Sequence, residues 1–545
     1  MRHSTNNYLS ILIATIFCCV LAACKNHLHP DKKIFYYNEQ SGIASLDPAF
    51  AKNQSIMWAV HQLYNTLVEV DENMQLKPSL AKSWVISNDR KTILFTLRND
   101  VFFTDDIAFV NGKGKKLTAA DVVYSFNRII NKNTASPGAW IFNNKVDTLL
   151  PFTAINDTTF KLQLQQPFQP ILGILSMQYC SIVAKEVVDY YGNNFRQHPV
   201  GTGPYAFVAW EEGQALILKK NAAYFEKDAQ GNRLPYVDGI KISFYDSKAT
   251  EFLAFQQHKL DFINDIDASF KDEVLTKTGQ LQPQWAGKIQ LQKHPYLNIE
   301  YLGILVDTTN PLVHTTPLRL QKIRQAINYG FDRRKMMLYL RNSIGTAAES
   351  GFVPKGLPSF NDSLVKGYYY NPNKAKQLLL EAGFGNGKGL PTITLLTIPV
   401  YADLAAYIAN ELNQIGITIQ IETVQKSLLL QQTAKGQALF FRASWIADYP
   451  DAENYLSVFY GNNPAPPNYT RFNNTEFNIL YNQALATTND SLRYKMYQQM
   501  DKIIIEQAPI IPLWYDMAIH VVHTNITGFY PNSLNMLELR RVRKN

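Results

Sequence analysis

Cysteine is scarce in this chain of 545 residues, which contains four. Three of them, Cys18, Cys19 and Cys24, lie in the first 24 residues. If that segment is removed or modified, only Cys180 is left in the body of the protein. A single thiol can form neither an intramolecular disulfide nor a zinc site built from several thiolates. The sequence therefore excludes a disulfide-stapled scaffold and a zinc–thiolate cluster.

Sequence motifs of catalysis are also missing. The chain contains no H-E-x-x-H and no G-x-S-x-G pattern, and its ten histidines are scattered. The glycine-rich segment 383–389 follows a predicted helix and precedes a predicted strand, which is the reverse of a phosphate-binding loop. We therefore expect a protein that is not an enzyme and needs no metal or other cofactor. A pair of glycosidase carboxylates stays open, since a chain of this length offers many such pairs, and missing motifs do not by themselves exclude catalysis.

A stripe of basic residues is lacking as well. The net charge is +8, and the 53 lysines and arginines are spread along the chain. A nucleic-acid-binding protein would gather them on one face or along one helix. The basic residues near the C-terminus, Arg540, Arg541, Arg543 and Lys544, are typical of a solvated tail. We expect no nucleic-acid partner.

The N-terminus carries the only long apolar run. Residues 8–23 are too short for a membrane span, which needs about 20 residues, but suit the core of a signal peptide. The run ends in Leu21-Ala22-Ala23-Cys24, which resembles the lipobox of bacterial lipoproteins. We expect a signal peptide over 1–23, an acylated Cys24 and a polar tether over 24–33. The protein would then lie in the periplasm or cell envelope, lipid-anchored to a membrane; an ordinary secretory signal is the alternative.

The body of the chain alternates between strand and helix patterns. Strands are predicted at 34–37, 93–97 and 160–164 from their apolar and β-branched residues. Helices are predicted from caps and apolar spacing, over 54–70, 117–131, 371–383 and 491–507. Loose alternation of this kind favours α/β lobes.

A series of short segments occurs in a fixed order over nearly the whole chain. The segments are 45–48, 63–68, 78–84, 95–98, 118–122, 199–205, 221–225, 324–333 and 508–513. Their order resembles that of the family 5 extracellular solute-binding proteins, which capture oligopeptides, dipeptides and nickel complexes. Each segment alone is weak evidence for the family, and its residues also fit ordinary structural roles. Together they make the resemblance specific.

The resemblance implies an α/β fold, the two-lobed type II periplasmic binding protein with an extra domain and a hinged cleft. The expected divisions are lobe I (34–75, 198–300 and 508–545), the extra domain (76–197) and lobe II (301–507). Because the chain crosses between the lobes more than once, the crossings can act as hinges, and a ligand would seal the cleft.

One segment, 440–451, resembles the ligand-contacting stretch of oligopeptide binders. The resemblance implies that Ser444 and Ile446 pair with a peptide backbone, that Asp448 accepts its α-ammonium, and that Trp445 lines a side-chain pocket. It also implies that Arg442 meets a carboxylate. The further candidates are Asp451 as a rival anchor, and Trp514 and Tyr515, which would close the cleft.

Ordinary structural roles for these residues stay open. Asp448 lies in a turn-like Asp-Tyr-Pro-Asp stretch, and Arg442 could form a structural ion pair. A role in binding a ligand is nonetheless chemically sound. A peptide added as a strand is bound through hydrogen bonds to its main chain, which is common to all peptides. A carboxylate that meets an ammonium in a closed cleft would fix the register at the first residue of the peptide.

We therefore predict a monomeric binding protein that captures peptides and delivers them to the permease and ATPase of an ABC transporter. Alternatives within the class are a nickel chelate, haem, an oligosaccharide or an opine as ligand. Alternatives outside it are a lipid-anchored hydrolase and a peptide-holding chaperone or receptor.

Overall fold

The computed structural model describes residues 32–267 and 270–545. The predicted signal peptide, Cys24 and nearly all of the tether lie outside the described residues. Among the helices of the described chain, none has the length and apolar character required to cross a bilayer.

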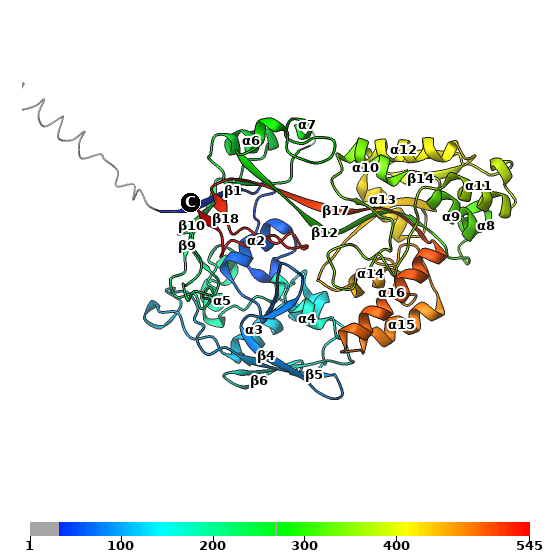
Figure 1. Cartoon of the computed structure of the whole chain (residues 1–545). Helices are drawn as coiled ribbons and strands as arrows, with labels where there is room; N and C mark the ends of the chain where they lie inside the picture. The colour runs from blue at the N-terminus through cyan, green and yellow to red at the C-terminus, as the bar shows by residue number, and fades with distance from the viewer. Residues whose placement is uncertain (1–31, 268–269) are drawn as a thin grey trace, which may run out of the picture.

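The fold is mixed α/β with two lobes, as the sequence predicted (Figure 1). A sheet of 11 strands runs through both of them in the order β15-β14-β16-β12-β17-β11-β1-β10-β9-β8, with β13 beside β17. The strands of the first lobe are β1 (Ile34–Asn38), β8 (Tyr205–Glu211), β9 (Ala215–Lys220), β10 (Gly239–Ser243) and β11 (Phe262–Asn264). Those of the second are β13 (Thr346–Ala347), β14 (Ile393–Thr397), β15 (Ile419–Thr423) and β16 (Phe440–Ile446).

Two long strands, β12 (Ile289–Ile304) and β17 (Ile510–His523), join the lobes. They pair antiparallel from Ile289 opposite His523 to Gly303 opposite Ile510. The register shifts between Pro295 and Ile299, so the ribbon is irregular where it passes from one lobe to the other. The predicted domain boundaries near residues 75, 197, 300 and 507 stay a prediction.

The predicted extra domain (76–197) shares one hydrophobic core with the first lobe and is counted with that lobe from here on. It contains a separate sheet of four antiparallel strands in the order β4-β5-β7-β6. These are β4 (Ala81–Ile86), β5 (Thr92–Leu97), β6 (Phe152–Asn156) and β7 (Thr159–Gln163), packed against α3 (Ala119–Ile130). Helix α3 confirms the helix predicted over 117–131. The backbone N–H of Thr118 donates to the carboxylate of Asp121 at 2.9 Å, so the helix begins where the capping pattern placed it.

The second lobe surrounds its strands with helices. They are α8 (Pro311–Thr315), α9 (Gln321–Tyr329), α10 (Arg333–Arg341), α11 (Pro372–Glu381), α12 (Ala402–Asn413), α13 (Lys426–Ala434), α14 (Glu453–Leu456), α15 (Thr475–Leu485) and α16 (Asp490–Gln507). Helices α11 and α16 confirm the predictions over 371–383 and 491–507. The side chain of Asn371 caps α11 by accepting from the N–H of Lys374 at 3.0 Å.

Helix α2 (Gln54–Leu63) is shorter than the predicted helix over 54–70. It ends because the segment 201–203 packs against its last turn, where the N–H of Gly203 donates to the carbonyl of Leu63 at 3.0 Å. A Cβ at Gly203 would lie 2.4 Å from the carbonyl carbon of Leu63, so only glycine allows this approach. The chain then continues into β2 (Val68–Val70), which pairs with β3 (Leu76–Pro78).

We expect Gly203→Ala to lower the free energy of unfolding by about 2 kcal/mol, because a methyl group must be inserted between two backbones. Urea denaturation followed by circular dichroism measures it. Gly385→Ala is the matched control, since a Cβ there meets only the end of the flexible Leu380 side chain at 3.0 Å. Equal stability of the two variants would contradict this explanation.

Candidate ligand-binding site

A cavity of about 800 Å³ lies between the two lobes. Both lobes and the crossing strand β12 contribute to its walls. Its lining includes Lys52, Met57, His61, Tyr64, Asn65, Glu69, Trp140, Met177, Gln178, Tyr179, Tyr296, Leu297, Ile446, Ala447, Asp448, Pro450, Glu538, Arg540 and Arg541. The volume is in the range of sites that enclose small ligands.

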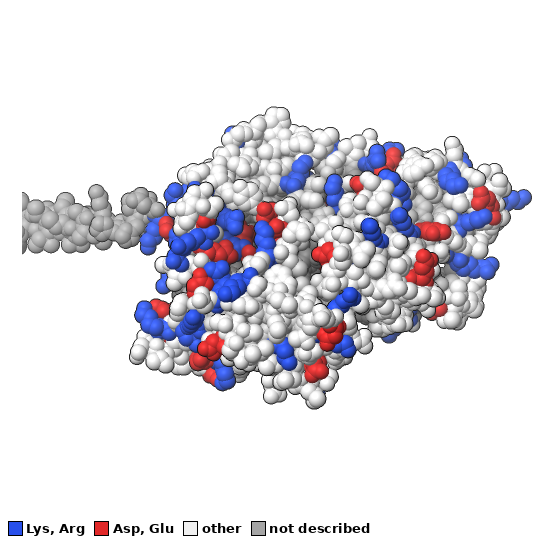
Figure 2. All heavy atoms as spheres, turned by 60° about the horizontal axis from the view of Figure 1, so that its bottom comes forward, with Lys and Arg blue, Asp and Glu red and all other residues white. Residues whose placement is uncertain are grey.

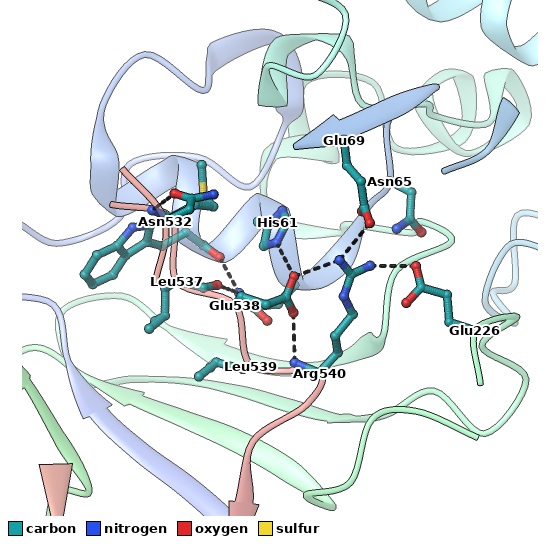
Figure 3. Close-up of polar contacts among 12 residues, drawn as sticks. His61, Asn65, Glu69, Glu226, Asn532, Leu537, Glu538, Leu539 and Arg540 are labelled. Atoms are coloured by element: carbon teal, nitrogen blue, oxygen red, sulfur yellow. Dashed lines mark hydrogen bonds and ion pairs between the residues drawn. The ribbon is translucent and has the colours of Figure 1, made fainter. Parts of the chain in front are cut away.

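Helix α2 presents Met57 and His61 to the cavity from successive turns of one face. The Nε2 atom of His61 lies 3.2 Å from the carboxylate of Glu538 (Figure 3). Its Nδ1 atom lies 3.4 Å from the side-chain nitrogen of Gln178. His61 thereby connects the C-terminal segment with η4 (Gln178–Cys180), a short 3-10 helix from the predicted extra domain.

Arg540 is the centre of an ionic network beside His61 (Figure 3). Its guanidinium lies 3.0 Å from Glu69, 2.7 Å from Glu226 and 3.0 Å from Glu538. Burial raises the pKa of Glu538, but the charge of Arg540 and the contact with His61 outweigh it and lower the pKa to about 2. Three carboxylates already neutralise Arg540, so its charge is not free for a ligand.

The interpretation of the C-terminal basic residues as a solvated tail is wrong for two of them. Arg540 is 8% exposed, and Lys544 forms an ion pair with Asp261 at 2.8 Å. The C-terminal segment is packed into the first lobe, and its charges have partners from distant parts of the chain. On the face drawn in Figure 2, acidic residues lie among the basic ones.

Asp448 faces the cavity just after the end of β16. Its carboxylate accepts from the side chain of Asn454 at 3.1 Å, and its backbone N–H donates to the same side chain at 3.2 Å. Asp448 is exposed to the cavity, although the protein around it displaces part of its solvent. No lysine, arginine or histidine of the described chain pairs with this carboxylate.

Tyr179 approaches Asp448 from the first lobe. Burial and the charge of Asp448 together raise the pKa of Tyr179 to about 12. Its ring packs directly on Gly138, where a Cβ would lie 2.4 Å from the ring. Because Gly138 has no side chain, the ring fits against its backbone, and Tyr179 forms an aromatic wall of the cavity beside Asp448.

Comparison with known proteins agrees with this architecture. The family model of bacterial extracellular solute-binding proteins, family 5 Middle, matches residues 75–467. The chain belongs to family 5 of the bacterial extracellular solute-binding proteins. Proteins of family 5 serve ABC importers, deliver their ligands to permease and ATPase complexes, and are periplasmic or extracellular.

Relatives within family 5 bind different solutes. Heme-binding protein A of Haemophilus influenzae is 27% identical and covers 96% of both chains. The dipeptide-binding protein DppE of Bacillus subtilis is 24% identical, over 94% of this chain and 92% of its own. HbpA2 from Haemophilus parasuis shares the fold with a TM-score of 0.82, at 24% identity over 94% of this chain and 100% of that one. The unliganded open form of the murein tripeptide-binding protein MppA has a TM-score of 0.80 to this chain. It is 21% identical, over 94% of this chain and 98% of its own.

Of the site residues predicted from the resemblance to family 5, the structure places Asp448 and Ile446 at the cavity. Ser444 and Trp445 lie on the same strand but do not line it. The indole nitrogen of Trp445 donates to Asn454 at 2.9 Å, so Trp445 supports the residue that holds Asp448.

The remaining predicted residues have partners elsewhere. Arg442 donates to Glu300 at 2.5 Å, and its guanidinium lies 4.0 Å from the centre of the Tyr401 ring. Arg442 therefore forms the structural ion pair that the sequence left open as its alternative role. The carboxylate of Asp451 accepts from Arg493 and from Tyr497.

Trp514 and Tyr515 are buried, at 0% and 3% exposure, away from the cavity. The hydroxyl of Tyr515 donates to the carbonyl of Gly351 at 2.7 Å. Ligand contact by Arg442, Asp451, Trp514 and Tyr515 stays a prediction.

Sequence reasoning missed His61, Glu69, Tyr179, Glu538 and Arg540. They come from separate segments, and no local pattern connects them. The only signal was the spacing of Met57 and His61, which places both on one face of a predicted helix.

We expect the free energy of unfolding to fall by about 3 kcal/mol as Glu538 becomes protonated between about pH 4.5 and pH 2. The pKa of Glu538 is lower in the folded than in the unfolded state, so this stability is present above the window and lost below it. Glu538→Gln should lack this part of the pH dependence, measured by urea denaturation. The control Glu476→Gln, at an exposed carboxylate without an ion pair in the described chain, should keep it.

Proposed function

We propose that this protein captures short peptides in the interlobe cavity and passes them to the permease and ATPase of an ABC importer. The observation that carries the proposal is Asp448, an exposed carboxylate that faces the cavity and has no cationic partner among the described residues. When the lobes close around a ligand, this carboxylate would lose its water, and the α-ammonium of a peptide would then supply its counter-charge. Tyr179 adds an aromatic wall, which favours a cation.

The free edge of β16 supports a peptide over other cations. This strand pairs with β12 along its whole length, from Ile446 opposite Asn298 to Phe440 opposite Ile304. On its other side it pairs with β14 only at Phe441. The backbone of residues 442–446 therefore has no neighbouring strand on that side within the described chain. An extended peptide could be added there through main-chain hydrogen bonds, which favour no particular sequence.

The opposite end of a peptide also finds suitable groups. Lys52 and Arg541 line the cavity from the first lobe, and neither forms an ion pair within the described chain. A short peptide would place its ammonium at Asp448 in the second lobe and its carboxylate near these cations in the first. Its two ends would then draw the lobes together.

We expect Asp448→Asn to weaken the binding of tri-alanine about 100-fold, because the variant leaves the ammonium without its counter-charge. Binding of N-acetylated tri-alanine should not change, since that peptide carries no ammonium. Isothermal titration calorimetry measures both. Asp362→Asn, at an exposed carboxylate outside the cavity lining, is the matched control. Equal losses for both peptides would contradict the role of Asp448.

Haem is a second candidate ligand, favoured by His61. A carboxylate partner on one ring nitrogen, here Glu538, is typical of histidines that bind a metal through the other. The other nitrogen of His61 lies 3.4 Å from the side-chain nitrogen of Gln178, so Gln178 would have to move aside for haem iron to bind. Heme-binding protein A is also among the relatives. An absorbance change of added haemin that is lost in His61→Ala, without any heat from peptides, would favour haem.

We also propose that Cys24 anchors the protein to a membrane through a lipid, because the residues before it resemble a lipobox. Cys24→Ser should move the full-length protein from the membrane fraction to the soluble one, or leave the precursor uncleaved. Immunoblots of fractionated cells measure this. Cys19→Ser is the control and should remain in the membrane fraction. Release of both variants alike would argue against acylation at Cys24.

A further inference from the structure

Three methionines line the part of the cavity wall that the first lobe forms: Met57, Met177 and Met536. They come from distant segments of the chain, yet each lies next to His61 or to one of its two side-chain partners. Met57 is one turn before His61 on α2, so both side chains extend from one face of that helix. Met177 directly precedes Gln178, whose side-chain nitrogen lies 3.4 Å from the ring of His61.

Met536 reaches the same place from the C-terminal segment. It lies two positions before Glu538, whose carboxylate is 3.2 Å from the ring of His61 (Figure 3). All three methionines pack against the hydrophobic core of the first lobe, Met536 as a buried residue and the other two as partly buried ones. Three segments that meet at one histidine thus bring the thioethers to one part of the wall. We call Met57, Met177 and Met536 the methionine wall.

The side chains of the methionine wall suit apolar groups of varied shape. A methionine has an unbranched, flexible chain and a polarisable sulfur, so it adapts to the surface that it meets. Met57 and Met177 are partly exposed at the cavity. An apolar group that packs on them removes their surface and its own from water, which favours binding.

The charges beside the methionine wall act against an acidic group. Arg540 is in contact with three carboxylates, so negative charge exceeds positive charge in this cluster. Two of these carboxylates, Glu69 and Glu538, also line the cavity. Repulsion between like charges grows where protein replaces water. This part of the cavity therefore favours apolar groups over acidic ones.

The methionine wall also lies close to the proposed ammonium site. Met177 is the residue that precedes η4, and Tyr179 on η4 stands beside Asp448. A peptide whose ammonium lies at Asp448 would therefore present one of its first side chains to the methionine wall.

We propose that the methionine wall selects solutes with an apolar group, and that in a peptide this group is the side chain of one of the first two residues. Leucine, methionine and phenylalanine fit there, and aspartate and glutamate are disfavoured. The selection among peptides rests on the proposed function, whereas the apolar subsite itself requires only that a solute binds in the cavity.

Peroxide footprinting of the full-length protein tests the subsite without a peptide. Peroxide converts an accessible methionine to its sulfoxide, and a group packed on the sulfur slows this reaction. N-acetyl-leucinamide carries a leucine side chain but no ammonium and no carboxylate, so its binding does not depend on Asp448. At about 0.1 M it should slow the oxidation of Met57 and Met177 about threefold, measured by mass spectrometry of proteolytic fragments.

Two controls accompany the footprint. N-acetylglycinamide has the same backbone without a side chain and should give no protection. Met496 is partly exposed on α16, outside the cavity lining, and its oxidation should respond to neither amide. Equal oxidation of Met57 and Met177 with the two amides would overturn the proposal.

Isosteric variants test the selection among peptides. Isothermal titration calorimetry should show that Leu-Ala-Ala or Ala-Leu-Ala binds about tenfold more tightly than the same tripeptide with glutamate in place of leucine. Met57→Gln and Met177→Gln keep the volume but add an amide, so each should reduce this ratio to about threefold. Met177→Leu stays apolar and should keep the ratio, as should the matched control Met496→Gln. An unchanged ratio in both cavity variants, or a preference for glutamate, would overturn the proposal.

A failure of peptide capture gives a different result. If no tripeptide binds while N-acetyl-leucinamide protects Met57 and Met177, the methionine wall is supported and the peptide function is wrong. If the tripeptides bind with equal affinity and the amide gives no protection, the peptide function is supported and the methionine wall is overturned.

Discussion

The antiparallel pairing of β12 with β17 is the constraint on which the rest of the molecule depends. Both strands run through both lobes, so a single sheet carries the strands of the two lobes on its two sides. The same ribbon positions the cavity. The N–H of Ala447 donates to the carbonyl of Leu297 on β12 at 2.9 Å, and this bond places the next residue, Asp448, at the cavity wall. A change in this pairing would therefore move the lobes and the predicted anchor together.

The chemistry of the cavity follows from which charges have partners. Arg540 and Arg442 each bond to carboxylates of the protein, so their charges are used in holding segments together. Among the described residues, Asp448 has only the amide of Asn454 as a side-chain partner, and its charge remains available. An ion pair inside a protein contributes little net stability but costs much when one partner is removed. The partnered arginines thus act as structure, and the unpartnered carboxylate is the group that a cationic ligand would complete.

The helices were predictable where their signals are local. Helices α3 and α11 begin at caps made between residues three positions apart, and such contacts depend little on the rest of the fold. Helix α2 shows the limit of this reasoning. Its apolar spacing continues past Leu63, yet the helix ends there because a segment some 140 positions later packs on it. The C-terminal tail illustrates the same point, since its charges are solvated only if no distant carboxylate meets them.

The sequence by itself determined the family, the mixed α/β class, and the place of Asp448 directly after a strand. These depend on the order of segments and on patterns a few residues long. Only the tertiary structure decided which side chains face the cavity. Arg442 and its partner Glu300 are 142 positions apart, and Trp58 bonds to the carbonyl of Asn535, 477 positions away. Such pairings exist only after the lobes have formed, and no spacing within one segment can encode them.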